Sequence, residues 1–136
     1  AKSAAAGLPL VSATAPKPDK PEGVPGLIAR ATLDKSHWLT YGYLRTELPV
    51  PVNGDVFLTP SKEGDNPVVL IGDDIVLAGF TWPDNTARLL KGSAWAVVEN
   101  VGSGKVILFA EDPLFRAFWR GPAGLFNNAL LFGPGR

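Results

Sequence analysis

The single histidine and the polar residues around it are the first side chains in this sequence that could perform chemistry. His37 stands in the run SHWLTYGY, with Ser36 beside it and Asp34 three residues upstream. A hydrolytic triad needs these residue types, but neighbours in sequence rarely meet in triad geometry, and the sequence has no G-x-S-x-G motif. We therefore expect His37 to be a turn residue whose ring bonds a backbone carbonyl, with a general-base function as the alternative.

The run EDPLFRAFWRG, residues 111–121, brings together acidic, basic and aromatic side chains. Acids that follow a central strand lie where α/β proteins commonly bind ligands. In the structural interpretation, Asp112 caps a helix, Pro113 occupies its first position, and Arg116 pairs with the acid one turn earlier. We favour the structural interpretation, and we predict that Asp112 lies at a helix N-terminus and that Arg116 is substantially buried.

Other candidate sites are incomplete. The run VGSGK, residues 101–105, is similar to part of a phosphate-binding loop, but Glu99 and Val106 stand where that loop needs a glycine and a serine or threonine. A hairpin turn explains it better. The acidic runs GDD and KEGDN offer too few oxygen ligands for calcium. With one histidine and no cysteine, the chain is also short of zinc ligands, so we expect it to hold no metal or cofactor.

Composition limits the class of protein. The 136 residues are 46% hydrophobic and 19% charged, as in a folded domain. Thirteen basic and thirteen acidic residues cancel, so no surface for nucleic acid is expected. No apolar run approaches the ~20 residues of a membrane-spanning helix. Because the sequence contains no methionine, even at position 1, we interpret it as a fragment of a longer protein.

The domain organisation follows from residue patterning. Residues 1–25 are rich in alanine and proline, which predicts a linker, and residues 26–134 are expected to form a single domain. Alternation at 27–33 predicts a strand with one solvated face. Hairpins are predicted at three turn sequences, namely Asn53-Gly54, Asp73-Asp74 and VGSG.

The strands and helices together predict the fold class. Pro49 and Pro51 place their strand at a sheet edge, and the unbroken apolar run VILFA predicts a central strand buried on both faces. A short helix is expected near 84–91, capped by Asp84 or Asn85, and a C-terminal helical segment near 113–132. The predicted fold is α/β on a mixed β-sheet with several hairpins, with α+β as the alternative.

Several motifs between residues 25 and 134 resemble the C-terminal domain of secreted bacterial zinc carboxypeptidases of the M14 family, which is similar in fold to class I glutamine amidotransferases. The resemblance lies in the runs PGLIARATLDKSHWLTYGY, GFTWPDNTARLLKGSAWAVVENVGSGKVILFAEDPLFRAFWRG and LFNNALLFGP. The motif positions expected to have structural roles are His37, Gly42, Asp112, Pro113, Arg116, Trp119 and Asn128.

The resemblance implies an accessory domain rather than an enzyme. Amidotransferases use a cysteine nucleophile, which this chain lacks, and carboxypeptidase zinc ligands belong to a separate N-terminal domain. The expected role is non-catalytic support or positioning of that peptidase domain, or of its peptide or cell-wall substrate, in an exported periplasmic or extracellular protein. The alternative is a module that binds carbohydrate, cell wall or a small ligand, in which exposed aromatic rings stack on sugars. The candidate rings are Trp38, Tyr41, Tyr43 and Trp82.

Overall fold

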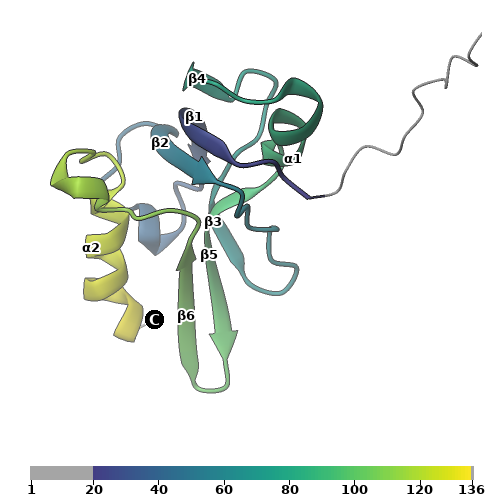
Figure 1. Ribbon diagram of the computed structural model, residues 1–136. Coiled ribbons are helices and arrows are strands. Elements are labelled where there is room, and N and C mark those ends of the chain that lie inside the picture. Colours follow the sequence, from purple (N-terminus) through teal and green to yellow (C-terminus); the bar gives the residue numbers. More distant parts are fainter. Residues whose placement is uncertain (1–19, 136) are drawn as a thin grey trace, which may run out of the picture.

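The computed structural model describes residues 20–135, which form a curled antiparallel sheet, a half-barrel, with short helical segments around it (Figure 1). Residues 1–19 of the predicted linker lie outside this range. The strands are β1 (Val24–Leu33), β2 (Glu47–Gly54), β3 (Asp65–Val69), β4 (Val76–Gly79), β5 (Ala94–Val101) and β6 (Gly104–Phe109). The helical segments are η1 (Trp38–Thr40), η2 (Pro83–Ala87), α1 (Arg88–Leu90), η3 (Phe115–Ala117), α2 (Ala123–Phe132) and η4 (Gly133–Gly135).

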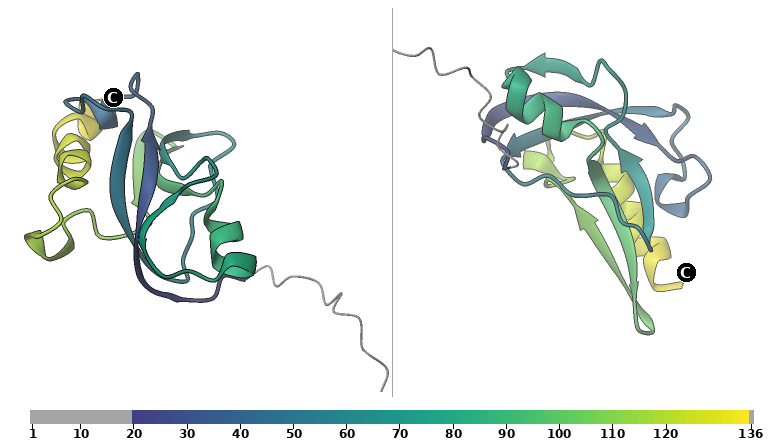
Figure 2. Two further views of the ribbon diagram at one scale, coloured as in Figure 1. Left: turned by 90° about the horizontal axis from the view of Figure 1, so that it is seen from above. Right: turned by 90° about the vertical axis from the view of Figure 1, so that its right-hand side faces the viewer.

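Strand β1 organises the sheet because it pairs along both of its edges. The strand order is β2-β1-β3-β5-β6, and β4 also pairs with β1. Its first half meets β4 at Leu27–Ala29, and its last residues, Thr32 and Leu33, meet β3. Strands β4 and β3 thus pair with the same edge of β1 at different positions along it. This arrangement makes the sheet curl, as the view from above in Figure 2 (left) shows. The arrangement confirms the predicted mixed α/β or α+β fold.

The core lies on the concave side of this sheet. Every second residue from Leu27 to Leu33 of β1 is buried, which confirms the predicted one-sided strand. Strand β5 is the most deeply buried, with Trp95 and Ala96 fully enclosed. The prediction that VILFA forms the central strand is wrong. Strand β6 is at the sheet edge, and Val106 and Leu108 stay 41% and 44% exposed, because the helix beside it covers only the face that carries Ile107.

The turn sequences predicted one hairpin correctly and two wrongly. Strands β5 and β6 form the hairpin expected around VGSG. Strand β2 pairs with β1 rather than with the residues after Asn53-Gly54, and Leu58 in that following segment bridges to Ala94 instead. Strands β3 and β4 flank Asp73-Asp74, but each pairs with β1. The buried strand β1, rather than the neighbouring arm of a hairpin, is therefore the partner of β2, β3 and β4.

The helix predicted near 84–91 is present as η2 followed by α1, and Gly92 ends it with φ +86°. Neither Asp84 nor Asn85 caps it, because its N-cap is Trp82. Asn85 is buried and instead fastens the chain before β1, with its Oδ1 accepting from the N–H of Glu22 at 2.7 Å. The hydroxyl of Thr86 donates to the carbonyl of Glu22 at 2.9 Å.

Substitution of Gly79 tests how closely β4 approaches β1. A Cβ at Gly79 would lie 2.6 Å from the carbonyl oxygen of Gly26, and its φ is +96°. Gly72 has φ +110° but no atom within 4 Å of the same position. Both substitutions to alanine cost about 1–2 kcal/mol in backbone strain, and Gly79→Ala is expected to cost about 1–3 kcal/mol more from the clash. Urea unfolding measures the difference, and equal losses would contradict the β1–β4 packing.

Candidate functional site

Three of the predicted motif residues meet where η1 packs against α2. We call this contact the η1–α2 junction, and it consists of His37, Gly42, Tyr43, Gly121, Leu125 and Asn128. The side-chain amide of Asn128 donates to the carbonyl oxygens of Leu39 and Tyr41, both at 2.8 Å. Gly42 lies in the same turn at φ +88° with open space around it, so this turn requires glycine for its backbone conformation.

Tyr43 is the residue at this junction that the motif interpretation missed. Its hydroxyl donates to the carbonyl of Gly121 at 2.6 Å and accepts from the N–H of Leu125 at 3.1 Å. A Cβ at Gly124 would lie 2.8 Å from that hydroxyl, so the helix can approach the ring only with glycine there. Burial raises the pKa of Tyr43, and the hydrogen bond accepted from Leu125 opposes this shift. The sequence signal that could have indicated this role is the Gly-Tyr pair at 42–43.

His37 begins η1 and caps this helical turn with its own ring. Its Nδ1 accepts the N–H of Leu39 at 3.1 Å, so the expected bond to a carbonyl is wrong: the ring accepts from an amide. The side chain is 9% exposed, and its Nε2 lies 3.6 Å from the carboxylate of Asp65. With Nδ1 as acceptor, Nε2 carries the proton of a neutral ring.

The neighbours of His37 are bound to each other. The hydroxyl of Ser36 donates to Asp34 at 2.6 Å, and this bond is the main reason that the pKa of Asp34 is lowered. The hydroxyl of Thr40 donates to the carbonyl of Asp34 at 2.5 Å. Because the serine hydroxyl is directed at Asp34 and the imidazole at its own turn, the three residues are not arranged as nucleophile, base and orienting acid.

The segment after β6 is less helical than predicted. The prediction that Asp112 caps a helix with Pro113 at its first position is wrong: Asp112 accepts the N–H of Leu114 at 2.8 Å and so forms a local turn, whereas the N-caps of η3 and α2 are Leu114 and Pro122. The turn continues only as η3, and α2 begins ten residues after Pro113, at Ala123. Arg116 and Ala117 have φ of 52° and 51°, in the left-handed region, so a right-handed helix cannot run through them.

The predictions for Arg116 are wrong. Its side chain is exposed, and its guanidinium lies 5.2 Å from the ring centroid of Phe115. Within residues 20–135, Arg116 forms no ion pair with Asp112 or any other acid. The left-handed backbone at Arg116 places it outside the helical spacing on which an i,i+4 pair depends.

Trp119 binds the free edge of β2 together with two other side chains. Its indole N–H donates to the carbonyl of Pro49 at 3.1 Å, and the indole of Trp95 donates to that of Pro51 at 3.0 Å. The next outward group, the N–H of Asn53, donates to Glu111 at 2.7 Å. The prolines have no N–H to leave unpaired, the predicted edge position of this strand is confirmed, and these three outward backbone groups have side-chain partners.

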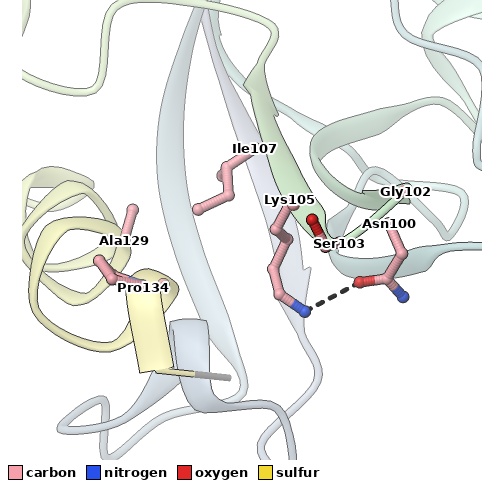
Figure 3. A pocket seen from close by; sticks show the side chains of 9 residues that line it. Asn100, Gly102, Ser103, Lys105, Ile107, Ala129 and Pro134 are labelled. Atoms are coloured by element: carbon pink, nitrogen blue, oxygen red, sulfur yellow. Dashed lines mark hydrogen bonds between the residues drawn. The ribbon is translucent and has the colours of Figure 1, made fainter.

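An open groove of about 400 Å³ lies between the β5–β6 turn and the C-terminal end of α2. Its lining includes Asn100, Ser103, Lys105, Ile107, Ala129 and Pro134 (Figure 3). The VGSGK run is here a hairpin turn with Gly102 at φ +60°, as predicted. The ammonium of Lys105 donates to the side-chain oxygen of Asn100 at 2.9 Å, within the hairpin itself.

Two general properties concern the described part of the chain. Residues 20–135 contain no cluster of three or more His, Asp or Glu side chains that could hold a metal ion. Among the helices of the same residues, none has the length and apolar character needed to cross a membrane.

Comparison with known proteins returned no match among protein-family models, curated proteins or solved structures. The similarity to a carboxypeptidase accessory domain thus rests on the motifs in the sequence and stays a prediction.

Asn128 and its neighbour Asn127 offer a matched test of the η1–α2 junction. Asn128→Ala leaves the carbonyls of Leu39 and Tyr41 without this donor and is expected to lower the free energy of unfolding by about 1–3 kcal/mol. Asn127 is exposed on the same helix, so Asn127→Ala makes the same change in helix propensity without losing those bonds. Chemical denaturation compares the two variants, and equal stabilities would show that the junction contributes nothing.

Ionisation of Tyr43 should lower the free energy of unfolding at alkaline pH. Because the folded-state pKa of Tyr43 is raised above the ordinary value of about 10, its contribution is complete below that pH and is lost as pH rises through the folded value. Tyr43→Phe is expected to cost about 1–3 kcal/mol at neutral pH, where two partners lose the hydroxyl, and to remove this part of the alkaline decline. Tyr41→Phe, at an exposed ring, is the control. Denaturation across pH 8–11 would contradict the assignment if Tyr43→Phe kept the full decline.

Proposed function

We propose that this chain is a non-catalytic accessory domain of a longer, exported zinc carboxypeptidase-like protein, and that it docks on the peptidase domain that would precede it. The motif resemblance suggests this role. The engagement of His37 as a cap of its own turn supports it, because a general base needs a ring nitrogen directed at a substrate.

The observation that carries the proposal is the tip loop, residues 114–118. Phe118 is 80% exposed and Leu114 is 40% exposed, with Arg116 exposed between them. The loop projects from the body of the domain next to α2 (Figure 1). Phenylalanine and arginine are enriched in protein–protein interfaces, where a protruding aromatic ring fills a partner's pocket.

The tip loop is held from both sides. Asp112 fixes its start through the N–H of Leu114, and Trp119 fixes its end on β2. The two consecutive left-handed residues, Arg116 and Ala117, cost free energy that the surrounding bonds must offset. A loop fixed in this way presents Phe118 in one position, which lowers the entropic cost of binding a partner.

A carbohydrate-binding module is the second candidate, and one aromatic pair favours it. Phe80 and Trp82 are 52% and 45% exposed, and their ring centroids lie 4.9 Å apart. Of the other rings expected to stack on sugars, Tyr41 is exposed, but Trp38 is buried and Tyr43 belongs to the η1–α2 junction. The exposed rings therefore lie on separate elements, which gives less support to a shared sugar platform than the tip loop gives to docking.

Phe118→Ser tests the docking surface. Because the ring is exposed, the change should leave the free energy of unfolding within about 0.5 kcal/mol of the wild type. It should weaken binding to the separately produced peptidase domain by about tenfold or more, as loss of an anchoring ring does. Titration calorimetry measures the affinity of the wild type and of Phe118→Ser for the peptidase domain. Leu131→Ser, at a 73% exposed position of α2, is the matched control.

Two results would contradict the proposal. One is a reading frame without a zinc peptidase domain upstream of this chain. The other is unchanged affinity of the Phe118→Ser variant for that domain. Binding of the isolated chain to insoluble cell-wall glycan, lost in Trp82→Ala, would favour the second candidate instead.

A further inference from the structure

The two edges of the sheet differ in how their backbone groups are satisfied. At the β2 edge, the outward carbonyls of Pro49 and Pro51 and the outward N–H of Asn53 all have side-chain partners. At the β6 edge the position of the outward groups follows from the pairing with β5. The N–H of Ala110 donates to the carbonyl of Trp95. From this bond onward, the residues of β6 alternate between those whose backbone groups bond to β5 and those whose backbone groups face outward.

This alternation directs the N–H and C=O groups of Lys105, Ile107 and Phe109 away from β5. No residue in the described range 20–135 hydrogen-bonds to these outward groups. In Figure 2 (right), β6 lies at the margin of the sheet with no other ribbon along its outer side. The strand contains no proline and none of its register positions is shifted, so it lacks two of the features that prevent edge-to-edge pairing, and Lys105 is its one charged residue.

We propose that β6 pairs antiparallel with β6 of a second copy of this chain, with Ile107 opposite Ile107 on the twofold axis. This interface is separate from the tip loop and goes beyond the accessory role proposed above. In this register the three outward-facing residues bond to one another, since Lys105 then lies opposite Phe109 of the second copy. Every outward backbone group of the strand gains a partner.

The side chains fit the same register. Val106, which is 41% exposed, lies opposite Leu108 of the second copy, which is 44% exposed, so two apolar cross-strand pairs form on the open face. Lysine at 105 faces an aromatic ring, and no like charges lie opposite one another within the strand. The twofold axis of an antiparallel strand pair is perpendicular to the sheet, so Val106 and Leu108 of both copies lie on one face, and the α2 helices of both copies lie beside the other face, which carries Ile107.

The length of the contact sets the expected strength. A strand pair of this length buries less than a standard interface, so we expect a concentration-dependent equilibrium with a dissociation constant of about micromolar or weaker. Sedimentation velocity of the full 136-residue chain over a concentration series measures it. Deuterium exchange at the amides of Lys105, Ile107 and Phe109 should slow as the concentration rises.

Charge substitutions at positions 106 and 108 test the register. The double variant Val106→Lys/Leu108→Lys should weaken self-association by about tenfold or more, because both apolar pairs become like-charge pairs. Val106→Glu/Leu108→Glu should do the same. An equal mixture of the two double variants should associate again, because each lysine then faces a glutamate. Both sites are partly exposed, and circular dichroism of each variant checks that the fold is kept.

Three outcomes would overturn the pairing. The first is a wild-type chain that stays monomeric at the highest attainable concentration. The second is a mixture of the lysine and glutamate variants that does not associate. The third is protection of the β6 amides that does not depend on concentration and disappears when residues 1–19 are deleted, because the occupant of the edge would then be the chain's own N-terminal segment. Phe118→Ser should leave self-association unchanged, so the outcome is independent of the docking proposal.

Discussion

The double pairing of β1 is the interaction on which the rest of this structure depends. One strand of ten residues binds β2 along one edge and both β4 and β3 along the other. Its alternate side chains, including Leu27, Ala29 and Leu33, contribute to the core. Because each neighbouring strand obtains its register from β1, the curl of the sheet and the positions of its two edges follow from this strand.

The C-terminal segment completes the domain through polar contacts as much as through apolar packing. Leu125 is fully buried, and the helix that carries it is tied to η1 by the amide of Asn128 and by the hydroxyl of Tyr43. The same segment supplies Glu111 and Trp119 to the outer edge of β2. Each of these bonds joins residues more than fifty positions apart, so the segment holds the first half of the chain in place.

The motif residues therefore have two kinds of role in the described structure. His37, Gly42 and Asn128 shape the η1–α2 junction, and Trp119 protects a sheet edge, so these residues have structural roles within the domain. Arg116 and its neighbour Phe118 are directed outward instead. The two surfaces proposed for partners are the tip loop, which contains Arg116, and the outer edge of β6.

The sequence by itself determined the local features of this protein. The alternation of β1, the hairpin turn at VGSG, the helix near 84–91 and the edge position of the strand with Pro49 and Pro51 all follow from patterns within a few residues. Such features are set by backbone sterics and by short-range hydrogen bonds, which depend on neighbouring residue types.

Only the tertiary structure decided which strands meet and which side chains are covered. The partners of β2 and β4 are set by the long buried strand β1 rather than by the turns beside them. The apolar run of β6 predicts a central strand, yet in the structure no further strand pairs with its outer edge, and one of its faces has no covering element. The exposure of Arg116 follows from left-handed backbone at two non-glycine residues, which long-range bonds of the flanking segments stabilise and which residue types alone do not indicate.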